Sequence, residues 1–147
     1  MAQLAVPAAD ITNQGYLDEA GVSTTIYSSI DEASPGDDND YVYSATAPSS
    51  DVYVCQLSAV TDPVSSSDHI VRYRYLKSNV GGAQIDLTIQ LRQSYASEGA
   101  PGTLVKQWSH TDISDEVTQV SQTLSGAEAD SITNYADLFL RFVFNQA

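Results

Sequence analysis

The stretch from residue 69 to residue 93 constrains the fold more than any other part of this sequence. Its second half alternates between apolar and polar residues, the apolar ones being Ile85, Leu87, Ile89 and Leu91. Alternation with a period of two predicts a β-strand with one buried face. The first half alternates as well and places Val71, Tyr73 and Tyr75 on one face. Glycines in the intervening residues 79–82 tolerate positive φ, so we predict a turn there.

Two arrangements of these strands fit the pattern. If they form a hairpin with a three-residue loop, Arg74 lies opposite Asp86 and Arg72 lies opposite Thr88. If the chain is a jelly roll, the two strands can instead lie in opposite sheets. The distance between Arg74 and Asp86 therefore distinguishes the two arrangements.

Other short segments along the chain are β-branched or alternate, and turn residues separate them. We predict strands over residues 22–30, 41–44, 52–58, 103–110, 116–124 and 138–144. Leu104 and Trp108 are expected to share a face, and Cys55 is expected to be a small core side chain. The nearly all-apolar run 138–144 predicts a strand that is buried on both faces.

These segments predict an all-β fold, an antiparallel β-sandwich resembling a jelly roll, formed by residues 19–147 as a single domain. Residues 1–18 are predicted to be an extended N-terminal arm, held by its own domain or by a neighbouring molecule. Ser125 and Glu128 have the spacing of a capping box, so one short helix is predicted near residues 125–134.

The charge of the chain is strongly unbalanced, with 19 acidic and 6 basic residues and a net charge of −13. No basic residue precedes Arg72. Binding to nucleic acid or to an anionic membrane requires a cationic surface, so we expect neither as a partner. No apolar run reaches the ~20 residues that cross a bilayer. The N-terminus has neither the basic residues nor the apolar run of a secretory signal.

All six basic residues fall in or next to predicted strands, whereas most acidic residues fall in loops. One interpretation is ordinary pairing of charges across strands. The other is a docking face, since arginine and tyrosine are enriched where proteins bind one another. Under the second interpretation, the candidate contact residues are Arg72, Arg74 and Arg141, together with Leu4 and Val6 of the arm.

No motif for catalysis is present. The sequence lacks Gly-x-Ser-x-Gly, and its two histidines, His69 and His110, lie at the ends of predicted strands without an assignable partner. The sequence predicts no cofactor. One alternative is a structural calcium ion, for which Asp37, Asp38 and Asp40 offer hard oxygen ligands. Their spacing is not that of an EF-hand, and a solvated acidic loop is the alternative. The tyrosines and Trp108 also allow stacking on a sugar.

Five segments together resemble a known family. They are residues 27–41, residues 68–77 (Asp-His-Ile-Val-Arg-Tyr-Arg-Tyr-Leu-Lys), residues 85–93, residues 108–111 and residues 122–138. This pattern is similar to a β-sandwich module that recurs in structural proteins of tailed bacteriophages and in marine viral sequences. The resemblance spans about residues 26 to 143. It carries no catalytic signature, and no binding residues transfer from it.

The resemblance implies a non-enzymatic virion protein, foremost a decoration (cement) protein that stabilises the assembled head. Its implied partners are the major capsid protein and further copies of itself in closed trimers. Its implied location is the exterior of the capsid, after synthesis in the host cytoplasm. The alternative is a domain of a tail or fibre that recognises a host glycan.

Overall fold

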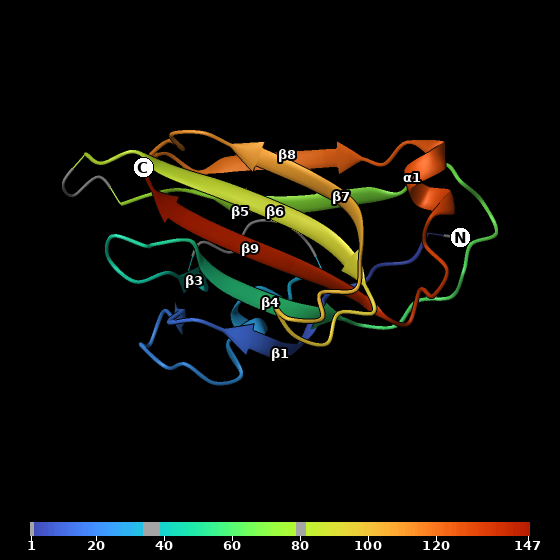
Figure 1. The fold of residues 1–147 in the computed structure, drawn as a ribbon, viewed down its shortest axis with the longest axis horizontal. Coiled ribbons are helices and arrows are strands. Elements are labelled where there is room, and N and C mark those ends of the chain that lie inside the picture. The colour runs from blue at the N-terminus through green and yellow to red at the C-terminus, as the bar shows by residue number, and fades with distance from the viewer. Residues whose placement is uncertain (1, 34–38, 79–81) are drawn as a thin grey trace.

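The computed structural model describes residues 2–33, 39–78 and 82–147, and its dominant element is an antiparallel sheet of five strands. The strands, in their order across the sheet, are β1 (Pro7–Asn13), β4 (Asp51–Leu57), β9 (Leu138–Gln146), β6 (Ile85–Gln93) and β7 (Thr103–His110). We call this the main sheet. The strand β9 lies at its centre, paired with β4 on one side and β6 on the other (Figure 1).

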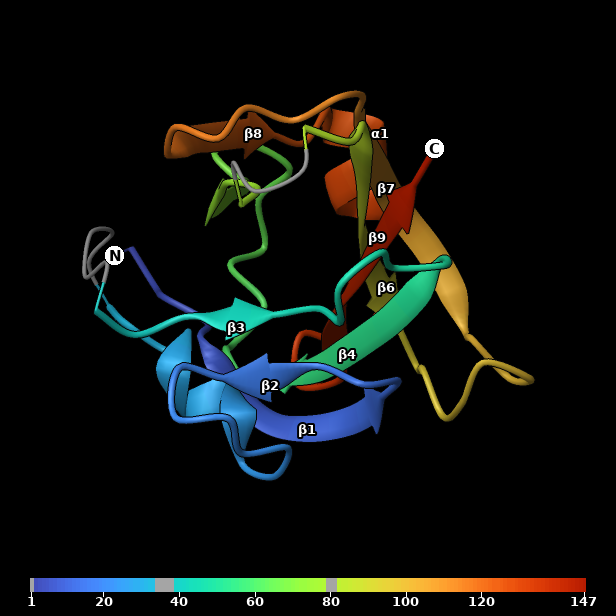
Figure 2. The ribbon, with the colours of Figure 1, turned by 90° about the vertical axis from the view of Figure 1, so that its left-hand side faces the viewer.

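A second, smaller layer lies across the inner face of the main sheet. It consists of β5 (Ile70–Tyr75) and β8 (Thr118–Thr123), which pair with each other in an antiparallel ribbon. Figure 1 shows this ribbon behind β6 and β7, and Figure 2 shows it standing away from β4 and β1. A separate pair of short strands, β2 (Leu17–Asp18) and β3 (Val42–Tyr43), lies near β1 and β4.

The chain alternates between the layers, from β4 to β5 to β6 and again from β7 to β8 to β9. This crossing back and forth, with the first of these strands adjacent to the last, is the connectivity of a jelly roll. The predicted all-β sandwich is therefore confirmed. The layers are unequal, however, since five strands face only two.

The alternation in the sequence sets which side chains form the core. The inner face of the main sheet carries buried apolar residues from its three central strands: Tyr53, Cys55, Leu87, Ile89, Leu91, Leu138 and Leu140. Burial raises the pKa of the Cys55 thiol to about 12, as expected for an inert core cysteine. The outer face has a smaller cluster, Val52, Val54, Tyr95 and Phe139. β9 is thus buried on both faces at Leu138–Leu140 only, whereas residues 141–144 are half-buried, so the prediction for residues 138–144 holds in part.

The structure decides between the two arrangements of the opening stretch. β5 pairs with β8, where Arg74 lies opposite Gln119, while β6 pairs with β7 and β9. The hairpin with Arg74 opposite Asp86 is therefore wrong, and the jelly-roll alternative holds. Local alternation specifies that a segment is a strand, but the partner is decided by which apolar faces meet.

Two other local predictions are wrong. The predicted strand at residues 22–30 contains a 3₁₀ helix, Ile26–Ser29, whose N–H groups at Ile26 and Tyr27 are bound by the carboxylate of Asp10. That carboxylate offers the backbone an alternative to a strand ladder. A bulge in β7 also separates Leu104, which is 43% exposed on the outer face, from Trp108 on the inner face.

The N-terminal segment divides into two parts. Residues 2–6 lie extended along the domain, where the side chain of Gln3 exchanges two hydrogen bonds of 2.8 Å with the backbone of Thr61. Residues 7–13 of the predicted arm form β1, an edge strand of the main sheet. The short helix α1 (Gly126–Asp130) begins at the capping box of Ser125 and Glu128, as the sequence predicts.

Candidate functional site

The unequal layers leave a hollow of about 2250 Å³ beside the small layer. Its floor is the inner face of the main sheet, including Leu140, Phe142 and Phe144 of β9. One wall is β5, since all its residues from Ile70 to Tyr75 border the hollow. The opposite side is formed by β3 and by the extended residues 2–7. A concave surface of mostly apolar lining with polar groups at its border is the usual form of a binding site.

His110 ties the small layer to the main sheet. It lies at the end of β7, and its two ring nitrogens are 2.7 and 3.1 Å from the hydroxyls of Tyr73 and Tyr75 on β5. Gln122 of β8 donates to the Tyr73 hydroxyl at 3.1 Å. A neutral imidazole donates from one nitrogen and accepts at the other, which suits two hydroxyl partners. Burial lowers the pKa of His110 and so favours this neutral form.

A second histidine forms a similar tie at the other end of β5. His69 lies 2.7 Å from the Tyr135 hydroxyl through Nε2 and 3.0 Å from the Ser67 carbonyl oxygen through Nδ1. A carbonyl only accepts, so Nδ1 donates to Ser67, and in the neutral ring Nε2 accepts from the Tyr135 hydroxyl. Burial raises the pKa of Tyr135, and Asp62 and Asp130 add to that shift. The Tyr135 hydroxyl therefore keeps its proton more firmly than a free tyrosine, and it can donate that proton in the hydrogen bond to His69.

Aromatic and basic side chains mark the border of the hollow. Tyr41 and Tyr43 are 49% and 40% exposed, and their ring centroids are 6.1 Å apart. Arg72 is exposed on β5. Leu4, which is 52% exposed, belongs to the extended segment that forms part of the opposite side. Both apolar and charged contacts are thus available at one opening.

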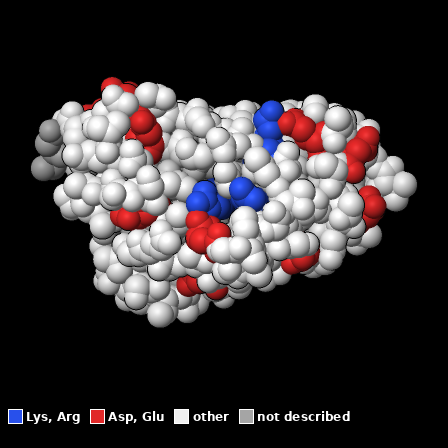
Figure 3. Space-filling model, in the orientation of Figure 1, with Lys and Arg blue, Asp and Glu red and all other residues white. Residues whose placement is uncertain are grey.

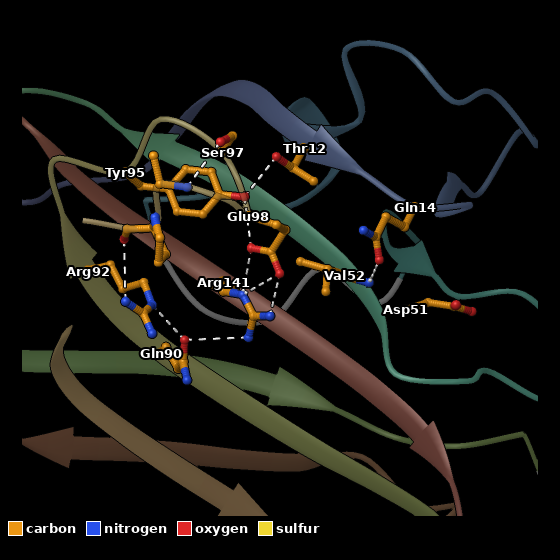
Figure 4. Close-up of polar contacts among 12 residues, drawn as sticks. Thr12, Gln14, Asp51, Val52, Gln90, Arg92, Tyr95, Ser97, Glu98 and Arg141 are labelled. Atoms are coloured by element: carbon orange, nitrogen blue, oxygen red, sulfur yellow. Dashed lines mark hydrogen bonds and ion pairs between the residues drawn. The ribbon is translucent and has the colours of Figure 1, made fainter. Parts of the chain in front are cut away.

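The outer face of the main sheet differs from the hollow, because the polar side chains around Arg141 form hydrogen bonds and an ion pair with one another. Arg141 of β9 is bound to the Glu98 carboxylate through two nitrogens, at 3.0 and 2.5 Å, and to Gln90 at 3.4 Å (Figure 4). Arg92 of β6 donates to the same Gln90 oxygen at 2.7 Å. The Arg141 guanidinium lowers the pKa of Glu98. Figure 3 shows basic side chains next to an acidic group near the middle of this face.

The loop that supplies Glu98 is itself fixed to the sheet. Tyr95 packs on Phe139, with ring centroids 5.8 Å apart, and its hydroxyl contacts both Glu98 and Thr12 at 2.9 Å (Figure 4). Gly102 at the end of this loop has φ +67°, and a Cβ there would meet the Gln93 carbonyl oxygen at 2.1 Å. The loop at residues 94–102 is therefore held on the outer face by packing and by hydrogen bonds.

The structure separates the candidate contact residues into two groups. Leu4, Val6, Arg72 and Arg74 all border the hollow, although they come from distant parts of the sequence. Arg141 does not join them, because it lies on the outer face in its pair with Glu98. Arg74 has interactions of its own. The role of all five in binding a partner stays a prediction.

The calcium hypothesis is only partly within the described structure. Asp37 and Asp38 lie outside the described residues, whereas Asp40 is exposed and borders the hollow. Among the residues that are described, no group of three or more His, Cys, Asp or Glu side chains is placed to hold a metal ion.

Sequence reasoning missed Glu98, Tyr95, Gln90 and the tie formed by His110. The spacing of Tyr73 with Tyr75 and of Trp108 with His110 places each pair on one face of its strand, which is a usable signal. That the two faces meet depends on the packing of two layers, which a strand pattern does not contain. Glu98 lies in a loop, and no periodicity reports its position.

A scan of the chain against protein-family models found no match, and neither did searches of the curated proteins and of the solved structures. Within the described ranges, none of the helices has the length and apolar character needed to span a membrane.

Proposed function

We propose that this chain is a non-enzymatic structural protein of a phage virion, a decoration protein that binds the assembled head and stabilises it. The observation that carries the proposal is the uneven sandwich. Five strands face two, so an open hollow remains beside the core. Half-buried Phe142 and Phe144 line its floor, and its border carries exposed apolar side chains, Leu4, Tyr43 and Ile70. Exposed apolar surface of this kind on a folded domain is typical of a site that another protein covers.

The charge distribution supports the same proposal. A net charge of −13 favours solubility of the free protein. Charged residues of both signs border the hollow, where the bases Arg72, Arg74 and Lys77 lie together with the acids Glu19, Glu32, Asp40 and Asp68. Charges placed around an apolar contact orient the partner and increase the rate of association.

The location of the protein in virions tests the proposal directly. Purified virions are separated on a gel, and the band of this chain is compared with that of the major capsid protein. A decoration protein is present in comparable copy number, and antibody labelling places it on the head. A few copies per particle, or labelling confined to the tail, would contradict the proposal.

Reconstitution tests the contact surface. Heads that lack the protein are mixed with the full chain or with a chain that lacks residues 2–6, and bound protein is measured by sedimentation. The shorter deletion is preferred to removal of residues 1–18, because Pro7–Asn13 form β1 of the main sheet. We expect weaker binding without residues 2–6, and wild-type binding would exclude this segment as a contact.

A second candidate function is recognition of a host glycan by a tail or fibre domain. The exposed pair Tyr41 and Tyr43 at the border of the hollow favours it, since tyrosine rings provide faces on which a sugar can stack. A glycan array probed with the labelled chain tests this function. Binding that is lost in a double Tyr41→Ala, Tyr43→Ala variant would support it, and no signal on the array would contradict it.

A further inference from the structure

The edge of β5 that borders the hollow has a defined set of backbone groups. Leu124 donates its N–H to the His69 carbonyl at 2.8 Å, which identifies residues 69 and 124 as a hydrogen-bonded pair of the β5–β8 ladder. Hydrogen-bonded and non-hydrogen-bonded pairs alternate in an antiparallel ladder. Val71, Tyr73 and Tyr75 therefore bond to β8, whereas the N–H and C=O groups of Ile70 and Arg72 point away from it.

These outward groups face the hollow. Every residue of β5 borders it, whereas Gln119 is the only residue of β8 that does so among those described. In the described part of the chain, no backbone hydrogen bond from outside the ladder reaches Ile70 or Arg72. An open strand edge beside an apolar surface is a template for one more strand.

The space beside this edge fits a strand in both length and polarity. A strand of about five residues, ~17 Å long at ~3.3 Å per residue, spans the outward groups of Ile70 and Arg72. Alternate side chains of such a strand would point toward the main sheet, where Leu140, Phe142 and Phe144 form the floor. The remaining side chains would point outward, on the same side as Arg72. The added strand therefore needs apolar residues at every second position.

The charge of Arg72 indicates which side chain the added strand should carry on its outward face. Arg72 is exposed in the middle of β5, and the ion pairs of the described residues use Lys77, Lys106 and Arg141 but not Arg72. A neighbouring strand places its side chains about 5 Å from those of β5, close enough for an acidic residue to pair with the guanidinium.

We propose that the open edge of β5 binds an extended segment of a partner protein as an added strand, with apolar residues facing the main sheet and an acidic residue beside Arg72. The inference rests on the proposed function and deepens it, because it names the part of the partner that is bound. The added strand continues the small layer of the sandwich toward β3.

The test uses the full chain, labelled with ¹⁵N, and a capped peptide of about seven residues in which valine alternates with glutamate. Binding is followed by NMR, with the largest shifts expected at the amides of Ile70 and Arg72. Methylation of the peptide nitrogens that face β5 removes two or more hydrogen bonds and should weaken binding about tenfold. Lysine in place of glutamate should weaken it roughly fivefold.

Three variants test the edge of β5. Arg72→Gln keeps the N–H and removes the charge, so a loss of about two- to fivefold is expected. Arg72→Pro also removes the N–H that faces the hollow and should weaken binding further. Ser121→Pro is the matched control, because Ser121 lies opposite Arg72 and its N–H faces the other edge of the ribbon. Binding to this control should change by less than about twofold.

Several outcomes would overturn the inference. They are no binding at millimolar peptide, shifts centred on β1, β7 or the outer edge of β8, and equal binding of the methylated peptide. Concentration-dependent shifts at β5 without any peptide would instead identify a second copy as the occupant and overturn the assignment to a partner protein. The peptide result does not depend on where the chain is found in a virion, so failure of the inference and failure of the proposed function are distinguishable.

Discussion

The two layers of this sandwich are held together in different ways. In the main sheet, each central strand is bonded along both edges, and most of its inner side chains are buried. The small layer has one ladder. Its side chains contact the main sheet, as in the hydrogen bonds of Tyr73 and Tyr75 with His110. Few buried contacts and open edges are features of regions that open locally. The layer that borders the hollow is thus the one best able to adjust to a partner.

The largest expected effect comes from truncating the core of the main sheet. Leu87→Ala removes a side chain that is 1% exposed and should lower the free energy of unfolding by about 3 kcal/mol. Val71→Ala on the inner side of β5 is the matched change in the small layer, and only about 1 kcal/mol is expected because Val71 is half-buried. Urea denaturation measures both, and equal losses would remove the distinction between the layers.

The ion pair on the outer face should contribute less than the core. Glu98→Gln leaves Arg141 without its charged partner and should cost about 1 kcal/mol, with faster proteolysis of the loop at residues 94–102. Because Arg141 lowers the pKa of Glu98, the stabilisation is present above the ordinary carboxyl pKa of about 4.3 and is lost as pH falls through the lowered value. The variant should lack this acid-dependent component in denaturation curves measured at a series of pH values.

A smaller, local effect is expected from protonation of His110. Its pKa is lowered by burial, so the unfolded chain binds more protons than the folded one between that lowered value and about 6.5. The stabilisation is therefore present above pH ~6.5 and is lost as pH falls toward the lowered pKa. Hydrogen exchange should accelerate at β5 amides in this window while main-sheet amides change little. His110→Gln should abolish the difference, and acceleration of both layers together would contradict a local opening.

The smallest effect is expected from metal. Since no cofactor is predicted, calcium or a chelator should shift the melting temperature by less than about 1 °C. Differential scanning fluorimetry gives the answer. A clear rise with calcium that disappears in a double Asp37→Asn, Asp38→Asn variant would establish a calcium site in the acidic loop, against our expectation.

The sequence by itself determined most of the strands, though not β1, together with the buried faces of β5 and β6 and the start of the helix. Those properties depend on periods of two and on local hydrogen bonds, as at Ser125 with Glu128, and they are readable over a few residues. The same pattern identified Cys55 as a core residue.

Only the tertiary structure decided how the strands are partnered. The pairing of β5 with β8, and not with β6, depends on apolar faces that are distant in the sequence, and so does the meeting of Tyr73 with His110. The bulge that turns Leu104 outward and the carboxylate of Asp10 that caps a 3₁₀ helix are also responses to surroundings outside their own segments. The hollow is the clearest case, because it results from the unequal number of strands in two layers and from no single stretch of residues.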